Sequence, residues 1–413
     1  MKDLVVNGER LWHTIEETAR FGGTGGGGVT RLALTDADRQ VRDWFARQCQ
    51  ALGCSVTVDD MGNMFARRPG RDNSLPPVAV GSHLDTQPSG GRFDGIVGVL
   101  AGLEILCTLH DADYTTDAPV EVINWTNEEG SRFPPPMIAS GVFGGFFRKD
   151  YAYARQDSNG LKLGEELERI DYKGKTRCGD HKLGAYFELH IEQGPILENE
   201  RKVIGIITGA QGMRWYEVTV TGRESHAGST PMPLRRDAML ACARVVEAVN
   251  RIALKHPPGV STVGLVRVKP NSPNVVPGLV FFSVDLRHPE AAVLQQMEDE
   301  LREALDKVAS AMKIKTKLET TWDSPAVWFD KTCIGAIRDA AGSGGYSHRD
   351  MLSGTGHDAV YVSRVAPAAM IFIPCREGIG HSELEYAKPE DVTAGANVLL
   401  QAVLRYNLIL SGG

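Results

Sequence analysis

The pattern of apolar and polar positions divides the chain into two kinds of sequence. In residues 1–212 and 327–413, short continuous apolar runs alternate with longer segments of helical periodicity. Continuous apolar runs fit strands that are buried on both faces, in a sheet covered by helices. Residues 213–326 instead contain segments that alternate with period two, such as RWYEVTVTG at 214–222, which is typical of an antiparallel sheet with one exposed face. The pattern therefore predicts an α/β domain with a mixed central sheet, interrupted by a smaller inserted α+β domain.

The inserted segment has its own order of elements. We expect strand, helix, strand, strand, helix and strand, which makes a four-stranded antiparallel sheet with two helices. The strands are expected at 214–222, 261–270, 278–288 and 313–322, and the helices at 235–254 and 290–312. The length of 413 residues exceeds that of one ordinary core and also favours two domains.

Composition narrows the class of partner. The net charge of −7 argues against nucleic acid or an anionic membrane as a partner. The longest apolar run, 96–106, is far shorter than a membrane span, and the N-terminal residues are too charged for a secretory signal. Seven cysteines, an odd number without a CxxC pair, are most simply explained as buried free thiols in a reducing cytoplasm. We expect a cytoplasmic globular protein, and a cysteine nucleophile has little support.

A glycine-rich run, GGTGGGG at 22–28, invites comparison with a phosphate-binding loop. It lacks the GK[ST] ending, and no apolar strand precedes it. A mobile loop is the better interpretation, and a nucleotide-binding module is the weaker one.

The densest group of reactive side chains lies in GSHLDTQPSGGRFDG at 81–95. His83 and Asp85 are two residues apart, so on a strand both point to the same face. A turn rich in Gly and Pro follows, and Asp94 then precedes a helical segment. In open α/β sheets the active site lies at the carboxyl edge of the strands, and histidine with carboxylates suits zinc or manganese. Taken alone, the segment also fits an ordinary strand tip with a solvated histidine and two turn aspartates.

Three further apolar strands also end in polar groups. Glu128 and Glu129 close one strand, His190 lies near the end of another, and His381 follows a third. Carboxylates at a buried strand end incur a desolvation cost unless a cation offsets it. Five candidate ligands exceed the three that one catalytic zinc uses, and they fit two metals bridged by one carboxylate. The candidates are His83, Asp94, Glu129, His190 and His381.

The two adjacent glutamates are expected to differ in role. On a strict strand Glu128 and Glu129 point to opposite sides, so only one should bind the metal. The other would face the substrate as a general base. Asp85 is better placed as an acceptor for the second imidazole nitrogen of His83.

The chain resembles a known family over nearly its whole length. The matching pieces are GSHLDTQPSGGRFDG, NEEGSRF, HIEQGP, SHAGSTPM, the segment from PNVVPG to DLRH, SGTGHDA and GHSELE. They resemble the di-metal amidohydrolase branch of the M20 peptidase superfamily, which includes N-carbamoyl-L-amino-acid hydrolases, β-ureidopropionases and allantoate amidohydrolases. The short gap from His83 to Asp94 is similar to this branch. The resemblance implies an aminopeptidase-like di-metal domain of residues 1–212 and 327–413, and a lid and dimerisation domain of residues 213–326.

The resemblance also implies roles for individual residues. Those matching the metal ligands are His83, Asp94, Glu129, His190 and His381, with Asp94 as the bridge. Glu128 matches the general base, and Asp85 matches the residue that orients the first histidine. His226 matches a histidine that reaches the active site from the partner subunit. The residues matching substrate contacts are Gln193, Gln211, Asn274 and Arg287, with the backbone at Gly356.

Several of these residues have ordinary explanations as well. Arg287 follows an apolar strand, where a substrate carboxylate would satisfy it, but a salt bridge to Asp285 or Glu290 would serve too. His226 lies in a Gly/Ser/Thr loop typical of a surface histidine, and Asn274 sits near prolines, where a turn is typical.

Three further polar residues also have an ordinary structural explanation. Gln193 and Gln211 fit ordinary surface positions, and His357 in SGTGHDA fits the start of a helix.

The expected activity is metal-dependent hydrolysis of an N-carbamoyl amino acid to the amino acid, ammonia and carbon dioxide. The resemblance implies two divalent ions per subunit, drawn from zinc, manganese, cobalt and nickel, and a homodimer formed through the inserted domain. Allantoate, an acylated amino acid or a dipeptide is the alternative substrate, and Met213 in QGMRWY favours a plain carbamoyl amino acid. A non-catalytic metal-binding protein is the alternative from another class. It is disfavoured because Glu128 and all the ligands are present.

Overall fold

The computed structural model describes residues 4–412 and divides into two compact units. Unit 2 is the continuous segment Ala210–Trp328, and unit 1 is formed by the chain on either side of it. Unit 1 contains the helices α1 (Gly8–Thr18), α2 (Asp36–Ala51), α3 (Ile96–Asp111), α4 (Ile138–Phe143), α5 (Lys149–Tyr153), α6 (Leu163–Arg169), α7 (Ile196–Glu200), α10 (Lys331–Ser343), α11 (Asp358–Val362), α12 (Pro389–Leu410) and the 3-10 helix η2 (Arg376–Gly378). Its strands are β1 (Ser55–Val58), β2 (Met64–Arg68), β3 (Val78–His83), β4 (Val120–Trp125), β5 (Ala185–Ile191), β6 (Ile204–Ala210), β15 (His348–Ser353) and β16 (Ala368–Ile373).

The sheet of unit 1 is mixed, as the apolar runs predict. The strand order is β1-β2-β4-β3-β5-β16-β6, and β15 also pairs with β6. The four central strands β4, β3, β5 and β16 run parallel, while β2 and β6 flank them in antiparallel orientation. The carboxyl ends of the four parallel strands therefore meet at one edge of the sheet. Side chains that follow these strands are brought together there.

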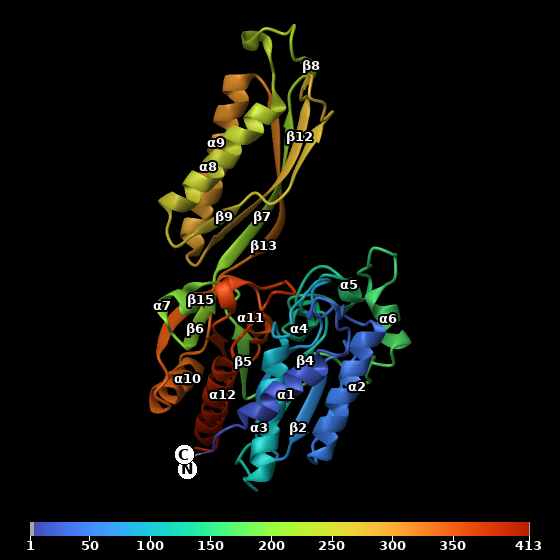
Figure 1. Ribbon diagram of the computed structural model, residues 1–413, viewed down its shortest axis with the longest axis vertical. Coiled ribbons are helices and arrows are strands. Elements are labelled where there is room, and N and C mark those ends of the chain that lie inside the picture. The colour runs from blue at the N-terminus through green and yellow to red at the C-terminus, as the bar shows by residue number, and fades with distance from the viewer. Residues whose placement is uncertain (1–3, 413) are drawn as a thin grey trace. The chain divides into compact units, whose positions relative to one another are not determined.

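Helices cover both faces of this sheet. Figure 1 shows α1, α3 and α12 side by side on one face, where Phe187 of β5 stacks edge-on against Tyr406 of α12. Gly98 allows α3 to approach closely, because a Cβ there would lie 2.5 Å from the carbonyl oxygen of Leu189. Alternate β5 residues face α11 on the other side, where Glu188 of β5 accepts a hydrogen bond from the N–H of Ala359.

Unit 2 is an α+β unit built on an antiparallel sheet. Its helices are η1 (Met232–Leu234), α8 (Ala238–Lys255) and α9 (Ala291–Met312). Its strands are β7 (Gly212–Thr221), β8 (Ser225–His226), β9 (Val260–Thr262), β10 (Val266–Lys269), β11 (Val275–Val276), β12 (Leu279–His288), β13 (Lys315–Ser324) and β14 (Val327–Trp328). Figure 1 shows α8 and α9 packed on one face of the sheet, which explains why every second residue of β12 is buried.

The sheet of unit 2 has five strands where the sequence predicts four. The order is β10-β12-β7-β13, and β9 pairs with β12 as well. The predicted strand 261–270 is wrong as a single element, because it is interrupted at 263–265 and forms β9 and β10. Gly264 lies in that interruption, and glycine weakens a strand interior.

The predictions from composition concern membrane spans and cysteines. Among residues 4–412, no helix combines the length and apolarity that crossing a membrane requires. All seven cysteines are free, and all but Cys107 are buried.

Candidate metal centre

One histidine–carboxylate group forms where β3, β5 and the start of α3 meet. His83 ends β3, His190 lies on β5, and Asp94 stands just before α3. Nε2 of His190 lies 3.1 Å from Oδ1 of Asp94, and the nearest ligand atoms of all three residues lie within 4.8 Å of one another. All three residues are buried.

A second group shares Asp94 through its other oxygen. Nε2 of His381 lies 3.2 Å from Oδ2 of Asp94 and 3.5 Å from Oε2 of Glu129. The ligand atoms of these three residues again lie within 4.8 Å of one another, and His381 is the one exposed member. All five predicted ligands therefore gather in two groups with Asp94 in common.

The imidazole tautomers suit metal binding. Nδ1 of His83 lies 2.9 Å from the backbone oxygen of Asp85, and Nδ1 of His190 lies 2.9 Å from that of Ile191. A carbonyl oxygen can only accept, so each Nδ1 carries a proton, and each Nε2 is the ring nitrogen that a metal would bind once it holds no proton. Nε2 of His83 is buried and forms no hydrogen bond with any residue that the structure describes.

The spacing and the charges also fit a divalent cation. Ligands placed 2.0–2.1 Å from a tetrahedral zinc are about 3.3 Å apart, close to the separations around Asp94. Burial lowers the pKa of His83 to about 4, so this ligand is neutral near pH 7. Burial, and then the charge of Asp94, raise the pKa of Glu129 well above its ordinary value. A bound cation would relieve this crowding of carboxylates.

Hydrogen bonds fix the charge of the shared carboxylate. Burial opposes ionisation of Asp94, but hydrogen bonds from His190 and His381 hold its pKa well below the ordinary value. The same contacts outweigh burial at His190 and raise its pKa to about 9. Asp94 is thus an anion placed between the two groups.

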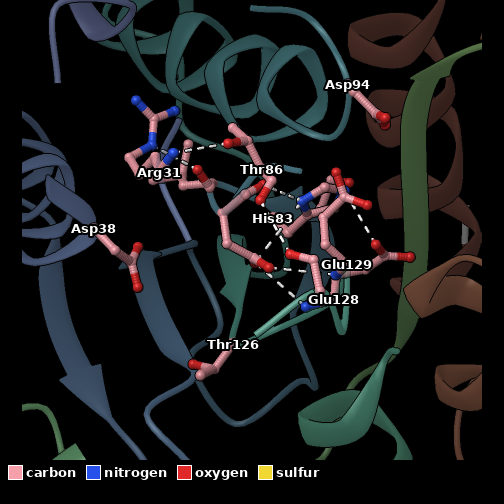
Figure 2. A network of polar contacts seen from close by, with 12 residues as sticks. Arg31, Asp38, His83, Thr86, Asp94, Thr126, Glu128 and Glu129 are labelled. Atoms are coloured by element: carbon pink, nitrogen blue, oxygen red, sulfur yellow. Dashed lines mark hydrogen bonds and ion pairs between the residues drawn. The ribbon is translucent and has the colours of Figure 1, made fainter. Parts of the chain in front are cut away.

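Glu128 and Glu129 follow β4 in a turn and not on the strand itself. The strand that the sequence predicts to close with Glu128 and Glu129 is shorter than expected, because β4 ends at Trp125 and Asn127 adopts a φ of 57°. The turn sends Glu129 toward His381 and leaves Oε2 of Glu128 3.4 Å from Nε2 of His83. Figure 2 shows both glutamates beside His83. The two side chains do differ in their surroundings, but a turn and not strand alternation separates them.

Asp85 lies beyond β3, which ends at His83, so the prediction that the two side chains share one face of a strand is wrong. Its carboxylate is 3.8 Å from Nδ1 of His83, and the backbone carbonyl makes the hydrogen bond instead. The two carboxylate oxygens accept the backbone N–H groups of Glu128 and Glu129, each at 3.3 Å. Asp85 therefore links β3 to the acidic turn.

A buried arginine fixes the segment just after β3. The backbone N–H of Arg31 donates to Oγ1 of Thr86, and the Nε of Arg31 donates to the carbonyl of Leu84 (Figure 2). Burial lowers the pKa of Arg31 to about 10, but it stays protonated near pH 7. The charge of Arg31 interacts favourably with those of Asp38 and Asp85.

Glu128 has the surroundings of a general base. It is 7 % exposed, and burial together with the charges of Asp358 and Glu129 raises its pKa well above the ordinary value. A carboxylate with a raised pKa accepts a proton more readily near neutral pH.

Three polar side chains near the ligands were not predicted to contact them. Nε2 of Gln87 donates to Glu129 at 2.7 Å, and Nε2 of Gln193, predicted as a substrate contact, donates to Asp94 at 2.6 Å. Oε1 of Glu385 accepts the N–H of Asp94 at 2.9 Å. All three residues lie in sequence motifs that carry the family resemblance, but only the structure shows that they contact the predicted metal ligands.

A third histidine–carboxylate group, Glu188, His190 and His357, is structural. Glu188 already accepts from Ser82 at 2.8 Å and from the N–H of Ala359 at 2.9 Å. Nε2 of His357 lies 2.8 Å from Oγ1 of Thr355, and its ring packs against His190. His357 is also the N-cap residue of α11, as its alternative explanation predicts. The glutamate could have been found from sequence, because it stands two residues before His190 on one strand.

Unit 2 carries four of the predicted site residues. His226 lies on β8, which pairs with β11, and the N–H of Ala227 donates to the carbonyl of Asn274 at 2.9 Å. This two-stranded ribbon brings His226 and Asn274 together. Gln211 lies between β6 and β7, and Gly356 of unit 1 lies between β15 and α11.

Two hydrogen bonds define the exposed imidazole of His226. Its Nδ1 accepts the N–H groups of Gly228 at 3.0 Å and Ser229 at 3.2 Å. The proton of the neutral ring is therefore on Nε2, which is available as a donor.

Arg287 forms the salt bridge that was its alternative explanation. Its Nη2 lies 2.7 Å from Oδ2 of Asp285 on the same strand. The pair is partly exposed, with about a fifth of each side chain accessible.

Comparison with known proteins places this centre in a family. Residues 79–405 match the model of the Peptidase family M20/M25/M40. The chain is 48% identical to an N-carbamoyl-L-amino-acid amidohydrolase of Rhizobium meliloti, over 97% of this chain and 96% of that protein. It is 32% identical to an allantoate amidohydrolase of Bacillus subtilis, with 93% and 94% covered. The crystal structure of a hydantoinase/carbamoylase family amidase from Burkholderia multivorans superposes with a TM-score of 0.95 at 55% identity, with 98% of each chain covered. The chain therefore belongs to the Peptidase family M20/M25/M40 and, within it, to the hydantoinase/carbamoylase family of amidases.

Proposed function

We propose that the protein hydrolyses the carbamoyl C–N bond of N-carbamoyl-L-amino acids, giving the amino acid, ammonia and carbon dioxide. One observation carries the proposal: two histidine–carboxylate groups share Asp94, and a buried Glu128 stands beside them. The 48% identity to the Rhizobium meliloti N-carbamoyl-L-amino-acid amidohydrolase supports this choice of substrate class.

Two divalent metal ions per subunit would occupy the centre. His83 and His190 with one oxygen of Asp94 would hold one ion, and His381 and Glu129 with the other oxygen would hold the second. Bound metal supplies a polarised carbonyl and a water acidified enough to attack it near neutral pH. Zinc, manganese, cobalt and nickel all accept such nitrogen and oxygen ligands.

Glu128 would move the proton during the reaction. Its raised pKa suits a base that removes a proton from the attacking water and later delivers that proton to the leaving amine nitrogen. Asp85 would hold Glu128 and Glu129 in place through their backbone N–H groups. Gln193, which donates to Asp94, would stand close enough to touch the substrate.

Residues of unit 2 would bind the substrate ends that are not cleaved. Arg287 and Asn274 would hold the α-carboxylate, since a guanidinium binds a carboxylate in a bidentate manner. His226, contributed by the partner subunit of a homodimer, would donate from Nε2 to the carbamoyl oxygen as negative charge develops there. Gln211 and the backbone at Gly356 would complete the substrate contacts.

Allantoate is the second candidate substrate. The 32% identity to the Bacillus subtilis allantoate amidohydrolase favours it. Against it, Met213 pairs with Arg287 across β7 and β12 and is itself buried. An apolar side chain beside Arg287 offers no hydrogen bond to the extra ureido group of allantoate.

Ammonia release from a small substrate panel tests the proposal. The panel contains several N-carbamoyl-L-amino acids, N-carbamoyl-β-alanine, allantoate and an N-acetyl amino acid, each with added manganese, cobalt, nickel or zinc. We expect N-carbamoyl-L-amino acids to give the highest kcat/KM. Faster turnover of allantoate would select the second candidate, and no turnover with any metal would refute the enzyme.

A further inference from the structure

Unit 1 contains a cavity that the proposed reaction does not use. It has a volume of about 320 Å³, which is in the range of pockets that bind small molecules. It lies between α7 with the residues after it and both ends of the loop that joins β16 to α12. That loop carries His381, but no metal ligand and no part of Glu128 lines the cavity.

The lining of this cavity is rich in cations. Arg201, Lys202, Arg376 and Lys388 all contribute to it. None of these four forms an ion pair with a carboxylate among residues 4–412, whereas nearby Arg349 pairs with Glu200. Unpaired cations that converge on one concavity attract an anion.

The two acidic residues of the lining do not cancel this charge. Four cationic side chains face two carboxylates, Glu198 and Asp391. Oε2 of Glu198 already accepts the N–H of Glu377 at 2.7 Å. The balance of two positive charges matches a ligand with two negative charges.

Arg376 connects the cavity to the metal centre. Its N–H donates to the carbonyl of Tyr386 at 2.8 Å, which closes the loop between them. Its guanidinium lies over the ring of Tyr386, 5.0 Å from the centroid, and Nη2 donates to the carbonyl of Leu384. Between these contacts stand His381, the exposed ligand, and Glu385, which holds the N–H of Asp94.

We propose that this cavity binds a small organic dianion, carrying a phosphate group or two carboxylates, and that binding there steadies the loop that carries His381. Arginine forks bind either group in a bidentate manner, and the two lysines add charge. An anion held by Arg376 restrains the base of the loop, so the metal ion held by His381 should leave more slowly. The proposal rests on the metal centre, but its binding step is measured independently of catalysis.

Anion titration of the metal-loaded protein tests the binding step. The probes are inorganic phosphate and succinate, followed by calorimetry and by thermal shift in a chloride-free buffer. The cavity variant is R376Q/K388Q, and the matched control is K175Q/K331Q, which removes two exposed cations outside the cavity. Any anion bound by the metals contributes equally to all three proteins. We expect the wild type and the control to bind one probe at least tenfold more tightly than the cavity variant. The preferred probe distinguishes a phosphate from a dicarboxylate ligand.

A second variant and a second measurement distinguish loss of cavity charge from disruption of the loop. R201Q/K202Q removes cavity charge but leaves the contacts between Arg376 and Tyr386 intact, so it must show the same loss of affinity. Metal loss to a chelator should slow several-fold in the presence of the probe in the wild type and the control only. Equal anion affinity in all variants would overturn the site, and an unchanged rate of metal loss would overturn its link to the loop. Either failure leaves the ammonia-release assay, and hence the proposed reaction, unaffected.

Discussion

The backbone carbonyl of Asp85, and not its carboxylate, accepts the hydrogen bond from Nδ1 of His83, with 2.9 Å between the oxygen and the nitrogen. The carboxylate is thereby free to accept the N–H groups of Glu128 and Glu129. One residue thus orients a ligand through its backbone and the acidic turn through its side chain. Substitution of the side chain should therefore disturb the glutamates more than the histidine.

We expect Asp85→Ala to lower kcat by about 10–100-fold, the usual effect of losing a residue that supports metal ligands. Asp85→Asn should retain more activity, because its amide still offers one acceptor oxygen. The metal content of these variants, measured by mass spectrometry, should fall less than kcat does. The reason is that the backbone carbonyl that orients His83 is unchanged. Complete loss of metal from Asp85→Asn would contradict this division of roles.

Replacement of the proposed base separates chemistry from metal binding. Glu128→Gln keeps the size of the side chain but cannot accept a proton, so kcat should fall by about 10²–10⁴-fold. The protein should still bind both metals, since Glu128 belongs to neither ligand group. Exposed Glu390 provides the control, and Glu390→Gln should match the wild type. A variant at Glu128 that loses metal instead would show that the two adjacent glutamates have exchanged roles.

Because Asp94 belongs to both ligand groups, its replacement should remove more metal than the replacement of His381. Asp94→Ala removes a ligand from both groups, so neither ion should survive gel filtration. His381→Ala removes a ligand only from the more exposed group, so the metal content should fall by half. Metal analysis of the two purified variants is the measurement. The same loss in both would argue against two separate ions.

Metal binding should stabilise the protein more strongly as pH rises. The metal-free fold raises the pKa of Glu129 and of Glu128, so these groups stay protonated to a higher pH than in the unfolded chain. Each therefore contributes stability to the metal-free protein that is lost as pH rises through its raised pKa. A metal ion binds the deprotonated ligand, so it must displace that proton at low pH and not at high pH. The increase in Tm on adding manganese should thus be larger at pH 8 than at pH 5.5. An increase that shrinks with rising pH would contradict the sign.

The convergence of the ligands could be predicted because it depends on topology. Parallel strands bring their carboxyl ends to one edge, so His83 and His190 meet whatever their exact side-chain rotamers. The contacts between separate loops could not be predicted. Glu385 reaches the N–H of Asp94 across 291 residues of sequence, and no local pattern records such a contact.

Local backbone conformation limited the prediction in the same way. The apolar run before Glu128 gives no sign that β4 ends at Trp125, because the strand ends where Asn127 takes a positive φ. Asparagine adopts this left-handed conformation more readily than most other non-glycine residues, but its presence alone does not fix where a strand ends. In the structure the side chain of Asn127 donates to the carbonyl of Phe133 at 2.9 Å, a contact within the loop that follows β4.

A mixed-subunit experiment tests whether His226 serves the site of its partner. His226→Ala and Glu128→Gln should each be nearly inactive as homodimers. A heterodimer of the two would contain one site with an intact Glu128 and an intact His226 from the other chain. Because Nε2 of His226 is the donor proposed for the carbamoyl oxygen, activity should reappear on mixing after reversible dissociation. The control mixes Glu128→Gln with Asp94→Ala. Each of these variants damages the centre of its own chain, so no heterodimer of the two contains an intact site. Recovery in the control as well as in the test pair, or in neither, would refute a shared site.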